Sequence, residues 1–97
     1  MTDMTVAKTI LEQLGGNRFI AMTGAKNFSG TENSLLFRVP SRKANWVKIT
    51  LDASDTYTME FSLVRGANIK SVKQVSMVYF DMLQDIFEEV TGFYTHF

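Results

Sequence analysis

The chain has 97 residues, 45% of them hydrophobic, and its ten basic and ten acidic side chains give a net charge of zero. This length and composition predict one globular domain over residues 1–97. The absence of cysteine excludes disulfides and thiolate-bound metals. No apolar run reaches the roughly 20 residues that cross a bilayer, and no signal peptide is visible, so we expect a cytoplasmic protein that does not contact membranes.

The charges are segregated along the chain. Residues 16–75 carry nine basic and four acidic side chains, a net charge of +5, whereas the two ends carry one basic and six acidic side chains, a net charge of −5. A basic middle suits an anionic partner, and solvated surface charge explains the same pattern equally well.

The first expected elements are a helix and a strand. Apolar side chains recur at helical spacing over residues 5–14, with polar side chains on the other side, and predict a short amphipathic helix. Gly15 and Gly16 end this helix, because glycine readily takes the left-handed cap conformation. Residues 18–23 then predict a first strand.

A loop, a second strand and a turn follow. Residues 24–33 are polar and contain two glycines, so they predict a loop. Residues 35–39 predict a strand that ends at Pro40, because proline has no N–H to donate to a neighbouring strand. Residues 41–45 predict the turn into the next strand.

Apolar and polar residues alternate over residues 47–51 and 56–61, around a short polar turn, and predict a β-hairpin. Opposed residues share a face, so the register must oppose the two apolar sets. The polar pairs that result are each worth roughly 0.2–1 kcal/mol. The predicted pairs are Val47 with Phe61, Lys48 with Glu60, Ile49 with Met59, Thr50 with Thr58 and Leu51 with Tyr57.

Residues 69–75 fit two structures. Ser71 with Gln74 three residues later resembles a capping box that begins a helix at Val72. The turn-like residues 65–68 instead send residues 69–74 back as a fifth strand, and this alternative is favoured, with the helix beginning at Ser76. The apolar stripe of that helix is Tyr79, Met82, Leu83, Ile86, Phe87 and Val90.

We expect this C-terminal helix to end at Gly92 and the aromatic residues 93–97 to fold back onto the domain. Together the elements predict an α+β fold, a four- or five-stranded antiparallel meander with an N-terminal and a C-terminal helix packed on one face as a two-layer sandwich. The other face of the sheet stays open. The dry face is lined by Phe37, Val39, Val47, Ile49, Leu51, Tyr57, Met59 and Phe61.

The usual catalytic sets are missing from the sequence. His96 is the sole histidine and lies next to the C-terminal residue, a poor platform for a triad, and it cannot complete a zinc site alone. The acidic ridge of Asp81, Asp85 and Glu88 is typical of a solvated helix face. Residues 23–26 lack P-loop spacing, although Lys26 can still contact a phosphate. We therefore predict no enzymatic activity, cofactor or metal.

The strongest candidate surface is the open face of the sheet. Because successive side chains of a strand alternate between the two faces, we expect Arg38, Trp46 and Lys48 to point away from the dry face. Cations there can bind phosphates while an exposed indole stacks on a base. Alternatively, Trp46 packs under a helix or is covered by Arg38 in a cation–π contact. The predicted nucleic-acid-binding residues are Arg38, Arg42, Lys43, Trp46 and Lys48.

The segments LGGNRFIAMTGAKNF, WVKITLDASDTYTMEF and VYFDMLQDIFEEVTGFYT resemble a family of small uncharacterised proteins encoded by bacteriophages and other bacterial mobile elements. The resemblance runs from about Leu14 to Thr95. It implies a protein that a mobile element makes inside a bacterial host cell. It implies no activity and assigns no functional residue.

Two functions from different classes remain. The first is a nucleic-acid-binding accessory protein that uses the five residues above. The second is a protein–protein interaction module, either a homodimer through the open sheet or an edge strand, or an inhibitor or adaptor of a host protein that uses the acidic helix. Zero net charge and six methionines, a residue type suited to adaptable surfaces, favour the second function.

Overall fold

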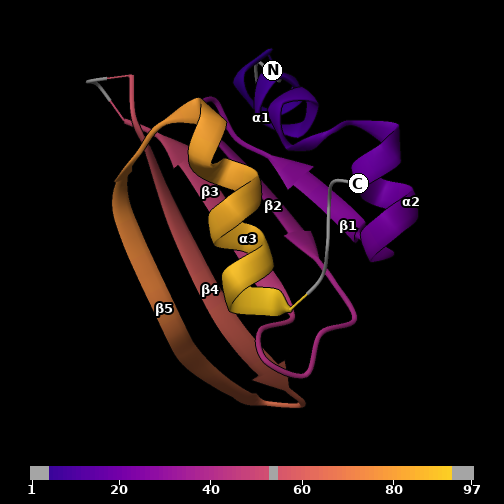
Figure 1. The fold of residues 1–97 in the computed structure, drawn as a ribbon. Coiled ribbons are helices and arrows are strands. Elements are labelled where there is room, and N and C mark those ends of the chain that lie inside the picture. The colour runs from indigo at the N-terminus through magenta and orange to yellow at the C-terminus, as the bar shows by residue number, and fades with distance from the viewer. Residues whose placement is uncertain (1–4, 53–54, 93–97) are drawn as a thin grey trace.

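The computed structural model describes residues 5–52 and 55–92, which form an α+β fold with a five-stranded antiparallel sheet (Figure 1). Each strand pairs with the strand before it, so the sheet is a meander with β1 and β5 at its edges. In chain order the elements are α1 (Thr5–Leu14), α2 (Asn17–Thr23), β1 (Lys26–Gly30), β2 (Ser34–Arg38), β3 (Trp46–Leu51), β4 (Tyr57–Arg65), β5 (Asn68–Val78), a 3₁₀-helical turn (Phe80–Met82) and α3 (Leu83–Thr91).

The three helices lie over one face of the sheet, and α3 crosses its middle (Figure 1). An aromatic cluster ties the two layers together. The Phe19 ring of α2 lies 5.5 Å from the Phe37 ring of β2 and 5.0 Å from the Phe87 ring of α3, both in edge-to-face geometry. Such contacts add roughly 0.5–1.5 kcal/mol each to the area they bury. The described helices leave the other face of the sheet uncovered.

The predicted hairpin is confirmed residue by residue. β3 and β4 pair in the expected register, from Val47 opposite Phe61 to Leu51 opposite Tyr57. The predicted dry-face residues are buried, except that Leu51 is half-buried. Strict alternation leaves one register that buries a whole face, which is why the sequence was sufficient here.

The ends of the outer helices also agree with the sequence. α1 covers the predicted residues and buries Ala7, Ile10 and Leu14 before it ends at the two glycines. α3 ends at Gly92, whose φ of 82° is left-handed and whose N–H donates to the Glu88 carbonyl. Both helices lie on the same face of the sheet, as predicted.

The prediction of a strand over residues 18–23 is wrong, because this segment is α2. Its buried residues, Phe19 and Thr23, are four positions apart, which is helical spacing. The Thr23 hydroxyl donates to the Phe19 carbonyl, and Gly24 caps the helix in the left-handed conformation. Arg18, Phe19 and Ile20 show no strict alternation that would have required a strand.

The predicted loop over residues 24–33 is also wrong, because it contains β1. Lys26 pairs with Arg38, and Ser29 pairs with Leu36 after an irregularity at which Asn27 has a φ of 57°. A strand with one apolar residue, Phe28, gives little signal in the sequence. β2 supplies the missing information, since its free edge offers hydrogen bonds that β1 satisfies. The sheet therefore has five strands, but its first strand is not the one predicted.

The fifth strand is confirmed, whereas the predicted start of the C-terminal helix at Ser76 is wrong. β5 continues to Val78, which pairs with Tyr57, and α3 begins at Leu83. Val75 and Val78 are three residues apart and imitate helical spacing, but an irregularity in the strand accounts for that spacing. Tyr79 and Met82 are consequently exposed rather than part of the core. The prediction for residues 93–97 lies outside the described residues.

Candidate nucleic-acid interface

One row of residues crosses the open face from edge to edge. The register sets Lys26 of β1 beside Arg38 of β2, Arg38 beside Trp46 of β3, and Trp46 beside Ser62 of β4. Neighbouring strands are about 4.8 Å apart, so Lys26, Arg38 and Trp46 lie within about 10 Å along the row. The row therefore places two cations next to an indole.

A second row lies one pleat further along. Lys48 of β3 stands between Leu36 of β2 and Glu60 of β4. Lys48 and Trp46 are two residues apart on one strand and so share the open face. Lys48 adds a third cation to this face, opposite Glu60 in the register.

The cations of the open face have no ion-pair partner among residues 5–52 and 55–92. An ion pair joins Lys73 to Glu89 at 3.9 Å, on the helix side of the sheet. Unpaired cations on a surface are free to bind an external anion, and Arg38 can do so with two parallel hydrogen bonds.

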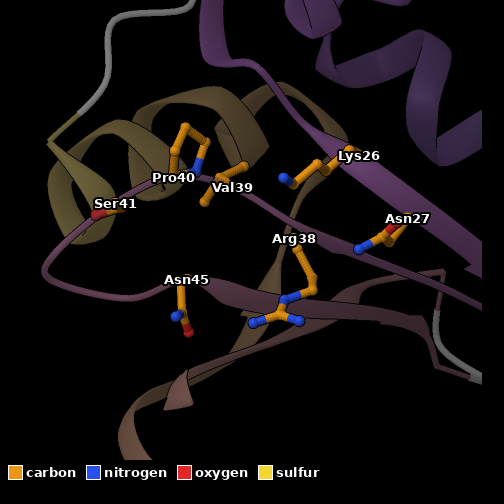
Figure 2. A pocket seen from close by; sticks show the side chains of 7 residues that line it. All are labelled: Lys26, Asn27, Arg38, Val39, Pro40, Ser41 and Asn45. Atoms are coloured by element: carbon orange, nitrogen blue, oxygen red, sulfur yellow. The ribbon is translucent and has the colours of Figure 1, made fainter. Parts of the chain in front are cut away.

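A basic pocket of about 290 Å³ opens at the Lys26 end of the first row (Figure 2). Its charged groups are the Lys26 ammonium and the Arg38 guanidinium, and the Lys26 side chain extends toward Val39 while the Arg38 side chain extends toward Asn45 (Figure 2). The remaining lining residues are Asn27, Val39, Pro40, Ser41 and Asn45.

A second, apolar pocket of about 360 Å³ lies on the other side of Arg38. Its walls are Trp46, Val64 and Ile69, with Ser62 beneath and the Arg38 side chain at the boundary. Ile69 is 74% exposed, an unusual position for an isoleucine. Trp46 is half-buried, and the next residue, Val47, is fully buried in the core beneath the helices, so Trp46 lies on the opposite face and does not pack under one of the described helices.

Asn45 holds the strand that carries Trp46 in place. Its side-chain nitrogen donates to the Val64 carbonyl at 2.8 Å, and its side-chain oxygen accepts from the Val64 N–H at 2.7 Å. Its backbone N–H also donates to the Ser62 carbonyl at 3.0 Å. The amide thus extends the β3–β4 ladder by one step and fixes the boundary between the two pockets.

Two of the five predicted site residues lie apart from these rows. The loop that carries Arg42 and Lys43 is docked onto α3, because the Ser41 hydroxyl donates to the Thr91 carbonyl at 2.8 Å. The Lys43 ammonium lies beside Gly92, at the C-terminal end of α3, where the helix dipole is negative. Arg42 is exposed on the same loop. The structure therefore brings together Arg38, Trp46 and Lys48.

No sequence pattern marks Asn45, Val64 or Ile69 as site residues, and Lys26 stands out in the sequence only as a lysine that can contact a phosphate from a loop. The pairing of β1 with β2 places Lys26, and the pairing of β4 with β5 places Ile69 opposite Val64. A sequence pattern could have found them only if both strands had been assigned correctly.

Other chemistry finds little support in the described part of the chain. No three histidine, cysteine, aspartate or glutamate side chains within residues 5–52 and 55–92 gather as a metal site. The acidic side of α3 is partly engaged inside the molecule, since Glu89 pairs with Lys73 and both Asp85 and Glu88 make further interactions. None of the described helices has the length and apolar character needed to cross a membrane. His96 lies outside the described residues.

Comparison with known protein families, with curated proteins and with solved structures finds no match to this chain. The resemblance to proteins of bacteriophages and mobile elements therefore remains a prediction.

Proposed function

We propose that this protein is a non-enzymatic nucleic-acid-binding protein and that it binds through the open face of its sheet. The observation that carries the proposal is the row of Lys26, Arg38 and Trp46, in which two cations without an ion-pair partner among the described residues lie on one side of a half-buried indole. Phosphates supply most of the affinity of such proteins, and aromatic side chains supply a surface on which bases stack.

Burial supports the same choice of face. The helices use the other side of the sheet to build the core, so a ligand on the open face displaces no part of the fold. Zero net charge does not argue against nucleic acid, because the acidic residues of α3 belong to the helix layer while the strand register puts Lys26, Arg38 and Lys48 on the open face. The resemblance to mobile-element proteins suits a cytoplasmic role of this kind in a bacterial host.

The test is the affinity for fluorescein-labelled oligonucleotides, measured by anisotropy over a series of salt concentrations. Binding through phosphates makes log K fall with log salt, by roughly 0.7–0.9 for each phosphate contact. We expect Lys26→Ala and Arg38→Gln each to weaken binding and to reduce that slope by about 1. Lys8→Ala removes an exposed lysine from α1 in the helix layer and should leave affinity and slope unchanged.

The proposal fails if the protein binds neither single-stranded nor double-stranded oligonucleotides at low salt. It also fails if Lys8→Ala weakens binding as much as Lys26→Ala, because net charge rather than the open face would then explain the affinity.

A protein partner is the second candidate, and an exposed apolar segment favours it. Met77 and Phe80 are each 61% exposed, and Tyr79 and Met82 are exposed beside them. Methionine and aromatic residues are enriched in protein interfaces. The edge of β5 is less suited to pairing with a strand of another chain. Two register irregularities interrupt β5, and the charged side chains of Lys70 and Lys73 disfavour such pairing.

If this segment joins two copies of the chain, sedimentation velocity will show a size that increases with concentration. Phe80→Ser should then abolish that increase, and because the side chain is largely exposed, the fold should be retained. A concentration-independent monomer would exclude the homodimer.

A further inference from the structure

The two pockets of the open face differ in chemistry and share one wall. Lys26 gives the first pocket a positive charge, whereas Trp46, Val64 and Ile69 make the second apolar. Arg38 lines both. A nucleotide has the same division, since its phosphate is anionic and the faces of its base are apolar. The volumes, about 290 and 360 Å³, lie at the lower end of the roughly 300–1,000 Å³ typical of ligand pockets.

Only an unpaired base can use the apolar pocket. In a duplex the faces of each base are covered by its neighbours in the stack, and its Watson–Crick edge is occupied by its partner. A single strand can turn a base out and lay it on an aromatic ring. Duplex binding would leave Trp46 and Ile69 without a role.

We infer that the open face is selective for single-stranded nucleic acid, and this inference rests on the proposed function. A phosphate lies in the basic pocket against Lys26 and Arg38. An unstacked base enters the apolar pocket, where it packs against Trp46 and Ile69. The Arg38 guanidinium spans the boundary and can bind the phosphate while its plane lies beside the base.

The rigidity of the boundary supports this assignment. Asn45 fixes the position of β3 relative to β4 through two side-chain hydrogen bonds to Val64, which is itself a wall of the apolar pocket. The distance between the two pockets is therefore built into the sheet, and binding needs no rearrangement of the backbone. A preformed site of this kind avoids the ordering cost that a flexible surface incurs.

The experiment compares a labelled oligothymidylate of about 12 nucleotides, a length within the span of small single-strand-binding domains, with a duplex of equal length. Unlabelled strands compete at one fixed salt concentration. We expect the single strand to bind more tightly. Trp46→Leu should weaken single-strand binding by roughly 5- to 150-fold, the loss that corresponds to one base–aromatic stack, and should leave duplex binding nearly unchanged.

Two further variants protect the test against a folding defect. Ile69→Gln changes a largely exposed side chain, so the fold should survive, and single-strand binding should fall by about fourfold, the equivalent of one buried methylene. Tyr79→Leu removes an exposed aromatic residue outside the pocket and should have no effect. Circular dichroism checks that each variant is folded.

The outcomes separate the two proposals. Equal affinity for both strand forms, with Lys26→Ala weakening both and the Trp46 and Ile69 variants weakening neither, would overturn single-strand selectivity and leave nucleic-acid binding in place. Absence of binding to either form would overturn both proposals. Selective loss of single-strand binding in the Trp46 and Ile69 variants, but not in Tyr79→Leu, is the result that supports the inference.

Discussion

The two faces of the sheet belong to the same strands, but they are built from different interactions. On the covered face, Phe37, Val47 and Ile49 are fully buried beneath the helices. On the open face, the alternate residues of the same strands, Arg38 and Lys48, are polar and half-buried. The covered face gains its stability from burial of apolar area, at about 25 cal/mol per Å². The open face contributes little burial and is therefore free to carry a binding site.

A mutation on the covered face should therefore affect stability, whereas a mutation on the open face should affect binding. Successive side chains of a strand point to opposite faces of the sheet. Two adjacent residues therefore differ in environment although they belong to the same strand. Such pairs are matched controls for each other.

The largest expected effect comes from one such pair on β2. Phe37→Ala removes the ring that contacts Phe19 and Phe87, and we expect a loss of about 3–5 kcal/mol in the free energy of unfolding. Leu36→Ala, on the open face of the same strand, should cost about 1 kcal/mol or less because Leu36 is half-buried. Urea unfolding measures both. Equal losses would mean that the open face is covered in solution, for example by self-association.

An intermediate effect is expected at Asn45, where hydrogen bonds rather than burial join the strands. Asn45→Ala leaves the N–H and the carbonyl of the half-buried Val64 without their partner, and we expect a loss of about 1–3 kcal/mol. Asn45→Asp keeps an acceptor for the N–H but sets a carboxylate oxygen against the Val64 carbonyl, so its loss should be at least as large. Urea unfolding of the two variants ranks them. A loss within about 0.5 kcal/mol for Asn45→Ala would contradict a structural role for this clamp.

The smallest effect concerns a polar contact at the covered face. The Tyr57 hydroxyl donates to the Gln13 side chain of α1 at 2.7 Å, so Tyr57→Phe should cost about 0.5–1.5 kcal/mol at neutral pH. Burial raises the pKa of Tyr57 above its ordinary 10.0, with a smaller lowering by the Gln13 hydrogen bond and a further raising by Asp55.

The sign of the resulting pH dependence follows from the raised pKa. Because the native protein holds the phenolic proton more tightly than the unfolded chain, this stabilisation is fully present below pH 10.0 and is lost as the pH rises through the native pKa. The wild type should therefore lose stability at alkaline pH faster than Tyr57→Phe. Parallel decline of the two proteins above pH 10.0 would contradict a native pKa raised by burial.

The fold was most predictable where the pattern was strict. The β3–β4 hairpin, the extent of α1 and the cap at Gly92 all follow from local patterns that have one low-energy solution. The errors lie in segments whose local preferences are weak. Residues 18–23 became α2 because Phe19 reaches the aromatic cluster from a helix, and residues 26–30 became β1 because β2 had an unpaired edge.

The candidate site was predictable in part. The alternation of apolar and polar residues was enough to predict that Arg38, Trp46 and Lys48 share one face, because these residues belong to strands in which that alternation is clear. Lys26, Asn45, Val64 and Ile69 could not be assigned to the same site, because their placement depends on β1, on a loop hydrogen bond and on the far end of β5.

Local sequence patterns were sufficient for the α+β class, the hairpin register and the division of the sheet into a dry and a wet face, because strand periodicity is a local property of the chain. Three features could be known only from the folded protein: the segment that fills the first edge of the sheet, the start of α3, and the meeting of two pockets at Arg38. These features depend on contacts between residues distant in sequence, and the free energy of such contacts exceeds the weak local preferences of the segments involved.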